Sequence, residues 1–135
     1  MDRDISMIIG TLTLVGRQKI REYISDYVTH PLYIGWGMCT TANVASETDT
    51  SLIGELGRAL ATTSATGNPL EVSISETIKA SYEILEMGIF TAASGGSMIY
   101  RGLFSKDGVT AKSRWINSGD SLEISIILNF ANGAF

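Results

Sequence analysis

Apolar and polar residues alternate through much of the second half of the chain. In the clearest run, 122–130, every second residue is Leu, Ile or Phe, and polar residues such as Glu123 and Asn129 stand between them. A two-residue period places successive side chains on opposite faces of a β-strand. Similar alternation marks three further segments: 70–75, 84–90 and 98–104.

Turn sequences rich in Gly, Ser, Asn and Asp separate these segments, and the turn signals recur about every 8–12 residues. That spacing is typical of all-β domains built from short antiparallel strands. We therefore predict a mainly β fold: an antiparallel, jelly-roll-like β-sandwich of seven or eight strands with one amphipathic helix near the N-terminus.

The predicted helix lies between Gly16 and Thr29, where the apolar period changes from two to about 3.6. His30-Pro31 ends it, because the residue before a proline is pushed out of the α region. We expect this helix to cover one face or end of the sheet; the alternative is a helix that binds a partner. The apolar stripe consists of Ile20, Tyr23, Ile24, Tyr27 and Val28.

The chain is predicted to divide into an N-terminal arm, residues 1–13, and a single β-sandwich domain, residues 14–135. Burying an apolar side chain of the arm on a neighbouring subunit could contribute ~1.5–3 kcal/mol. The arm is therefore a predicted assembly contact, and the alternative is an edge strand on its own domain. Its four apolar residues within five positions are Ile5, Met7, Ile8 and Ile9.

Self-association into a homo-oligomer is also expected, because a sandwich leaves unpaired backbone groups along its edge strands. The segment 69–75 carries few charges that would repel such pairing, so it is the predicted pairing edge.

Composition and charge exclude several classes of partner. The formal net charge is −4, and the 10 Lys and Arg residues are scattered, which argues against nucleic-acid binding. The longest apolar run is too short to span a bilayer, and the first residues lack the features of a signal peptide. We therefore expect folding in a cytoplasm, with no membrane partner. The single cysteine, Cys39, cannot form an internal disulfide.

Candidate catalytic and metal-binding groups are sparse. A Ser or Cys nucleophile needs a base, and the chain has one histidine, His30, at the predicted helix end. Cys39 is interpreted as an inert thiol. Zinc needs three or four suitable ligands, and the pair Glu47 and Asp49 is the candidate for calcium, although such loop acids are usually solvated. We predict no enzymatic activity, no catalytic or metal-binding residue and no cofactor.

A structural motif is predicted in the segment 84–90. Glu86 is separated from Ile84 and Phe90 by even numbers of residues, so the three side chains are predicted to share one face of a strand. We interpret that face as the one that points to the core. A carboxylate there should be hydrogen-bonded or paired, because an unpaired buried charge is costly. Gly88 in the same row suggests a bulge or a close approach by a ring or backbone. We expect Glu86 to anchor a strand bend as a buried acceptor; the alternative is a ligand pocket.

Five segments combine turns and strand starts in a recognisable order: 33–37 (YIGWG), 55–58 (ELGR), 84–90 (ILEMGIF), 92–101 (AASGGSMIYR) and 116–124 (INSGDSLEI). This order, over about residues 31–128, resembles a family of small structural proteins of tailed bacteriophages. Some members resemble jelly-roll capsid decoration, or cement, proteins.

The resemblance implies a virion protein, made in the host cytoplasm, that sits on the outer capsid surface. It would bind major capsid protein subunits and stabilise the shell by buried area and strand pairing, without chemistry. The chain has the bulkier Trp36 and Met38 where the family has small residues. Trp36 is therefore also a candidate assembly contact.

Two alternative functions stay open. The first is a tail or tail-fibre adaptor with the same sandwich, which a much lower copy number per virion would favour. The second is a carbohydrate-binding module that uses exposed aromatic residues, although such residues also suit cores and interfaces. The candidate aromatic residues are Tyr33, Trp36, Tyr100 and Trp115.

Overall fold

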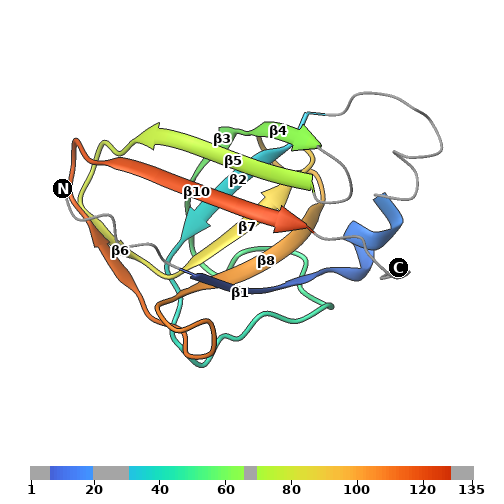
Figure 1. The fold of residues 1–135 in the computed structure, drawn as a ribbon, viewed down its shortest axis with the longest axis horizontal. Helices are drawn as coiled ribbons and strands as arrows, with labels where there is room; N and C mark the ends of the chain where they lie inside the picture. Colours follow the sequence, from blue (N-terminus) through green and yellow to red (C-terminus); the bar gives the residue numbers. More distant parts are fainter. Residues whose placement is uncertain (1–6, 20–30, 66–69, 129–135) are drawn as a thin grey trace.

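The computed structural model describes residues 7–19, 31–65 and 70–128 of the chain (Figure 1). This part is mainly β, and its strand pairings are antiparallel, as the alternation predicts. The described strands are β1 (Met7–Leu12), β2 (Tyr33–Gly37), β3 (Glu55–Leu60), β4 (Thr62–Ala65), β5 (Leu70–Thr77), β6 (Tyr82–Ile84), β7 (Glu86–Phe90), β8 (Met98–Ser105), β9 (Arg114–Ile116) and β10 (Ser121–Leu128).

These described ranges contain ten strands, whereas seven or eight were expected. One expected strand, 84–90, is interrupted at Leu85 and contributes to both β6 and β7. The strand β3 and the short strands β4 and β9 were not expected, because their residues show no clear alternation of apolar and polar side chains.

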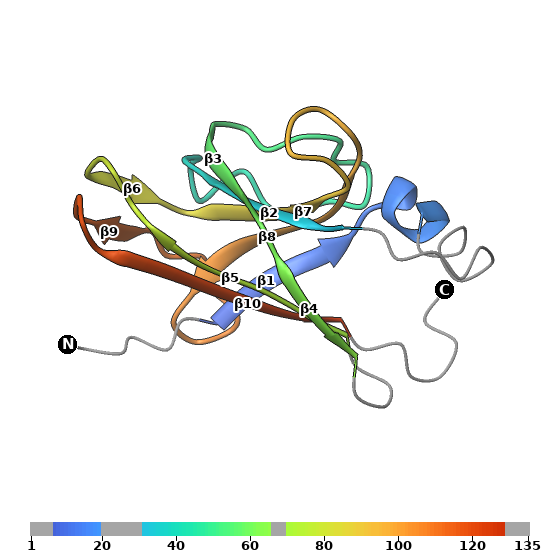
Figure 2. The same cartoon turned by 90° about the horizontal axis from the view of Figure 1, so that it is seen from above.

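Two antiparallel sheets pack against each other, and a small ribbon lies at one end (Figure 2). The larger sheet has the order β1-β8-β7-β2-β3, the smaller has the order β10-β5-β4, and β6 pairs with β9 in the ribbon. A single residue, Ala61, separates β3 from β4, so the chain passes from the larger to the smaller sheet at this corner. In each sheet the edge strand farthest from this corner is β1 in the larger sheet and β10 in the smaller sheet.

The main hydrophobic core lies between the two sheets. Along β10 the side chains alternate between exposed and buried, and Ile124 and Ile126 are buried from the smaller sheet. Ile34 of β2 and Ile89 of β7 are fully buried in the same cluster from the larger sheet. Each such aliphatic side chain stabilises the fold by ~1.5–3 kcal/mol relative to an exposed one.

Residues 7–12 of the predicted arm lie on the domain itself. They form β1, which pairs with β8 from Met7↔Ser105 to Leu12↔Tyr100. Ile8 is partly buried against the main core. This is the edge-strand arrangement given above as the alternative. Residues 7–12 are therefore part of the domain and do not form a free arm. Ile5 lies outside the described residues, and only the backbone pairing of Met7 and Ile9 is described.

A short helical segment, residues 14–19, follows β1. Thr13 caps its start, since its buried hydroxyl accepts a hydrogen bond from Gly16 N at 2.8 Å and donates to Met98 O at 2.7 Å. The helix therefore begins at Leu14, whereas the apolar pattern predicted a start at Gly16. The rest of the predicted helix, with its apolar stripe, lies outside the described residues.

The segment 69–75 was predicted to offer a pairing edge, and this prediction is wrong. Its described part belongs to β5, which is the central strand of the smaller sheet, between β10 and β4. The edges of the smaller sheet are β10 and β4.

Candidate functional site

The most distinctive polar structure in the described residues lies on the outer face of the larger sheet. Met87 and Ile89 point inward to the main core, so Glu86, Gly88 and Phe90 point to the opposite face. A loop, residues 38–54, covers this face, and we call it the clamped loop.

The phase predicted for Glu86 was therefore wrong in one respect. Ile84 belongs to the inner core, not to the row of Glu86. The chain changes phase at Leu85, whose N–H donates to Gly37 O at 2.9 Å and whose carbonyl oxygen accepts from Phe104 N at 2.8 Å. The burial of Glu86 comes from the clamped loop and not from the packing of the two sheets.

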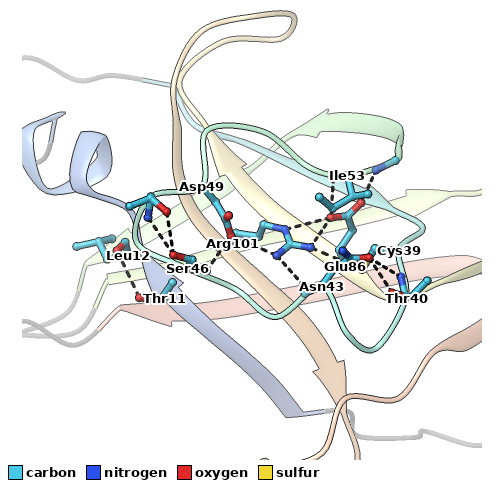
Figure 3. Close-up of polar contacts among 12 residues, drawn as sticks. Thr11, Leu12, Cys39, Thr40, Asn43, Ser46, Asp49, Ile53, Glu86 and Arg101 are labelled. Carbon is cyan, nitrogen blue, oxygen red and sulfur yellow. Dashed lines mark hydrogen bonds and ion pairs between the residues drawn. The ribbon is translucent and has the colours of Figure 1, made fainter.

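Glu86 is fully buried and accepts four hydrogen bonds (Figure 3). Its Oε1 accepts from Ile53 N at 3.0 Å, and its Oε2 accepts from Gly54 N at 2.7 Å. Arg101 donates to Oε1 twice, from Nε at 3.1 Å and from Nη2 at 3.0 Å. The carboxylate thus joins β8 to the end of the clamped loop.

Arg101 is only 1% exposed and connects β8 to the middle of the clamped loop. Its Nη1 donates to Asn43 O at 2.9 Å and to Asp49 Oδ2 at 3.2 Å (Figure 3). Its Nη2 also donates to Cys39 Sγ at 3.6 Å. We call Glu86 and Arg101, with these loop contacts, the clamp. Its buried charges are paired and hydrogen-bonded, as burial requires.

Sequence reasoning missed Arg101. In the register of β7 and β8 it lies opposite Gly88, on the same face as Glu86. A signal was available: Arg101 is a lone charged residue within an apolar strand, across a Gly-Gly turn from a strand that carries a lone Glu. Folding the two strands back on each other about that turn places the two charges near each other.

Glycines on this face make room for the clamped loop. A Cβ on Gly37 would overlap the carbonyl oxygen of Gly54 and would come within 2.9 Å of Glu86 Oε2. A Cβ on Gly88 would lie 3.1 Å from Met98 Sδ and 3.2 Å from Leu52 Cδ2. Gly88 is thus a site of close approach, by side chains and by the Tyr100 backbone, and the register shift of β7 against β8 lies just beyond it, between Ile89 and Phe90.

A second Arg–Glu pair organises the neighbouring turn. Arg58 donates to both carboxylate oxygens of Glu55 at 2.8 Å, and its guanidinium lies 3.5 Å from the ring centroid of Phe90. Its Nη1 donates to Ala92 O at 2.9 Å and to Gly95 O at 3.0 Å. Phe90 therefore supports the arginine that holds the turn between β7 and β8.

Trp36, predicted as an assembly contact, is instead a core residue. Its side chain is 5% exposed and packs in the main cluster. It faces inward because its neighbours Gly35 and Gly37 occupy the outer-face positions of β2. Gly57 on β3 leaves room for the indole, since a Cβ there would lie 2.9 Å from Trp36 Cε2.

Among the four aromatic residues considered for carbohydrate binding, Trp115 has the most exposed side chain. It is 60% exposed, and its Nε1 donates to Asn117 Oδ1 at 2.8 Å. Tyr33 and Tyr100 are half-buried, and burial raises the pKa of Tyr100 to about 12.

The acidic loop residues considered for calcium have protein partners. Asp49 pairs with Arg101, and Glu47 pairs with Arg17 at 3.2 Å. Within 7–19, 31–65 and 70–128, no group of three or more Cys, His, Asp or Glu side chains is arranged to hold a metal ion. Over the same ranges, no helix has the length and apolar character needed to cross a membrane. His30 lies outside them.

Cys39 is expected to react slowly with iodoacetamide at neutral pH. Partial burial raises the pKa of its thiol, the negative charge of Glu86 raises it further, and Arg101 opposes both. A raised pKa leaves less thiolate, which is the reactive form. The midpoint of the pH–rate profile should lie above that of the same chain in denaturant. A midpoint at or below the denatured value would contradict this interpretation.

Comparison of the chain with protein-family models, with curated proteins and with solved structures gave no significant match.

Proposed function

We propose that this protein is a structural component of a tailed-phage virion that decorates the capsid and stabilises it by binding major capsid protein subunits. The proposal includes a jelly-roll-like sandwich with an amphipathic helix near the N-terminus. Two antiparallel sheets around one core, with crossovers that pair β1 with β8 and β5 with β10, support that arrangement.

The observation that carries the proposal is a set of three exposed apolar side chains on a loop that buried polar contacts hold to the sheet. Met38, Val44 and Ile53 of the clamped loop are 48%, 68% and 60% exposed. The clamp holds this loop from beneath through Glu86 and Arg101. A contact surface that is already ordered loses less conformational entropy when it binds, which raises its affinity for a partner. This property suits a protein whose function is to bind a shell.

The motifs that carry the phage resemblance support the same reading. YIGWG supplies Gly37, beneath the loop end, and ELGR supplies Glu55 and Arg58. The remaining motifs on β7 and β8 supply Glu86 and Arg101. In this chain these motifs therefore supply residues that fix surface loops on a sheet, which is what a binding scaffold needs.

The test uses heads of the phage that encodes the chain, prepared without it. Purified chain should bind these heads at high copy number and raise the temperature at which they rupture. Val44→Asp and Ile53→Asp should each weaken binding by roughly tenfold, because each would bury an unpaired carboxylate in the interface. Leu60→Asp is the matched control, since Leu60 is 63% exposed on β3, outside the clamped loop.

Three results would overturn the proposal. The chain could be absent from purified virions, or it could be present only at the tail in about a dozen copies, which would favour the adaptor alternative. The third result is equal loss of binding in Leu60→Asp and in the two loop variants, with all three folded by circular dichroism.

A further inference from the structure

The strand β10 is the longest unprotected edge in the described part of the chain. It pairs with β5 over eight residues, from Ser121↔Thr77 to Leu128↔Leu70, with no shift in register. No described strand pairs with its other side. Natural edge strands are usually blunted by shortness, bulges, proline or lysine, and β10 has none of these devices.

The other described edges are blunted or short. The ladder of β3 contains a register shift opposite Trp36 and Gly37, and the strand carries the charged pair Glu55 and Arg58. β4 has four residues, and β6 and β9 have three each. β1 has six residues and contains Gly10, which weakens a strand. β10 is therefore the edge best suited to pair with another strand.

The pattern of β10 is complementary to itself. If two copies pair antiparallel about Ser125, residue 124 of one copy faces residue 126 of the other, and 122 faces 128, so buried positions meet buried positions. On the exposed face Glu123 meets Ile127, which is 65% exposed, and Ser125 meets its own copy. The single charge of the strand thus never meets its like.

We propose that β10 is a self-association edge, on which a second copy of this chain adds antiparallel and joins two smaller sheets into one continuous six-stranded sheet. Main-chain hydrogen bonds across the two β10 strands would hold the pair, as in other cases of strand addition. This inference goes beyond the proposed capsid role and holds without it, because it concerns the chain alone.

Analytical ultracentrifugation of the chain should show a monomer–dimer equilibrium that depends on concentration. Ser125→Lys and Ser125→Glu should each weaken the dimer by about fivefold, because like charges directly opposite on paired strands are destabilising. Mixing the two variants should restore association as a heterodimer. The effect should shrink at high salt, which screens exposed charges.

The matched control is Ser64→Lys, an identical change on the exposed face of β4, at the opposite edge of the same sheet. It should leave the dimer unchanged. A second measurement is oxidation of Ser125→Cys in a Cys39→Ser background, which should yield a covalent dimer. A chain that stays monomeric at every concentration overturns the proposal. So does a dimer that tolerates both charged variants, or one that the mixture does not restore.

Discussion

Replacing Arg101 by methionine is expected to lower the free energy of unfolding by about 3–5 kcal/mol, because it leaves a buried carboxylate without its cation. Glu86 is fully buried, and two of its four hydrogen bonds come from this guanidinium. The same change releases Asn43 O and Asp49 from the clamp. Urea denaturation followed by tryptophan fluorescence measures the loss.

Two further variants isolate the role of burial. Arg17→Met breaks the partly exposed ion pair with Glu47 and should cost less than about 1 kcal/mol. Adding Glu86→Gln to Arg101→Met removes the uncompensated charge and should recover part of the lost stability. Equal destabilisation by Arg17→Met and Arg101→Met would show that the clamp contributes no more than a surface pair.

The substitution Gly37→Ala is expected to destabilise the protein by about 3 kcal/mol, at the upper end of the usual range for overpacking. The added methyl group would overlap the carbonyl oxygen of Gly54 and crowd Glu86 Oε2 at 2.9 Å. Neither group can move freely, because Gly54 N donates to Glu86 and Gly54 O accepts from Met38 N at 2.9 Å. The thermal midpoint and denaturant midpoint should both fall.

Gly35→Ala, two residues earlier on the same face of β2, provides the graded comparison. Its nearest obstacle is the Phe90 ring, at 2.8 Å from the added Cβ, and a ring can rotate or shift where backbone cannot. The loss should therefore be smaller than for Gly37→Ala. A larger loss at Gly35 would mean that stability depends more on the packing of Phe90 and Arg58 than on the contacts of Gly37 with Gly54 and Glu86.

The local pattern of the sequence predicted where the strands lie more accurately than it predicted what packs against each of their faces. Alternation in β10 identified both the element and its buried face, because a period of two fixes which side chains share a face. At 84–90 the same reasoning put Glu86 in the row of Ile84, since alternation cannot reveal the change of phase at Leu85. Side chains on both faces of β7 are buried, so apolar content alone did not distinguish the two faces.

Non-local pairing limited the rest of the prediction. The low charge of 69–75 fitted an edge strand and a central strand equally well, and only pairing with β4 and β10 decides between them. The burial of Trp36 likewise depends on Gly57, a residue of the neighbouring strand. Arg101 could be recognised as the partner of Glu86 only after β7 and β8 were placed in register.

The sequence separations within the clamp also predict an order of events as the chain folds. Glu86 and Arg101 are 15 residues apart in sequence, whereas Asn43 and Arg101 are 58 apart. Closing a longer loop costs more chain entropy, so we expect the β7–β8 hairpin and its ion pair to assemble first and the clamped loop to dock later. Contacts that form after the rate-limiting step slow unfolding without speeding folding. We therefore expect Asn43 and Asp49 to contribute to the lifetime of the native state, and the hairpin to contribute to the speed at which that state is reached.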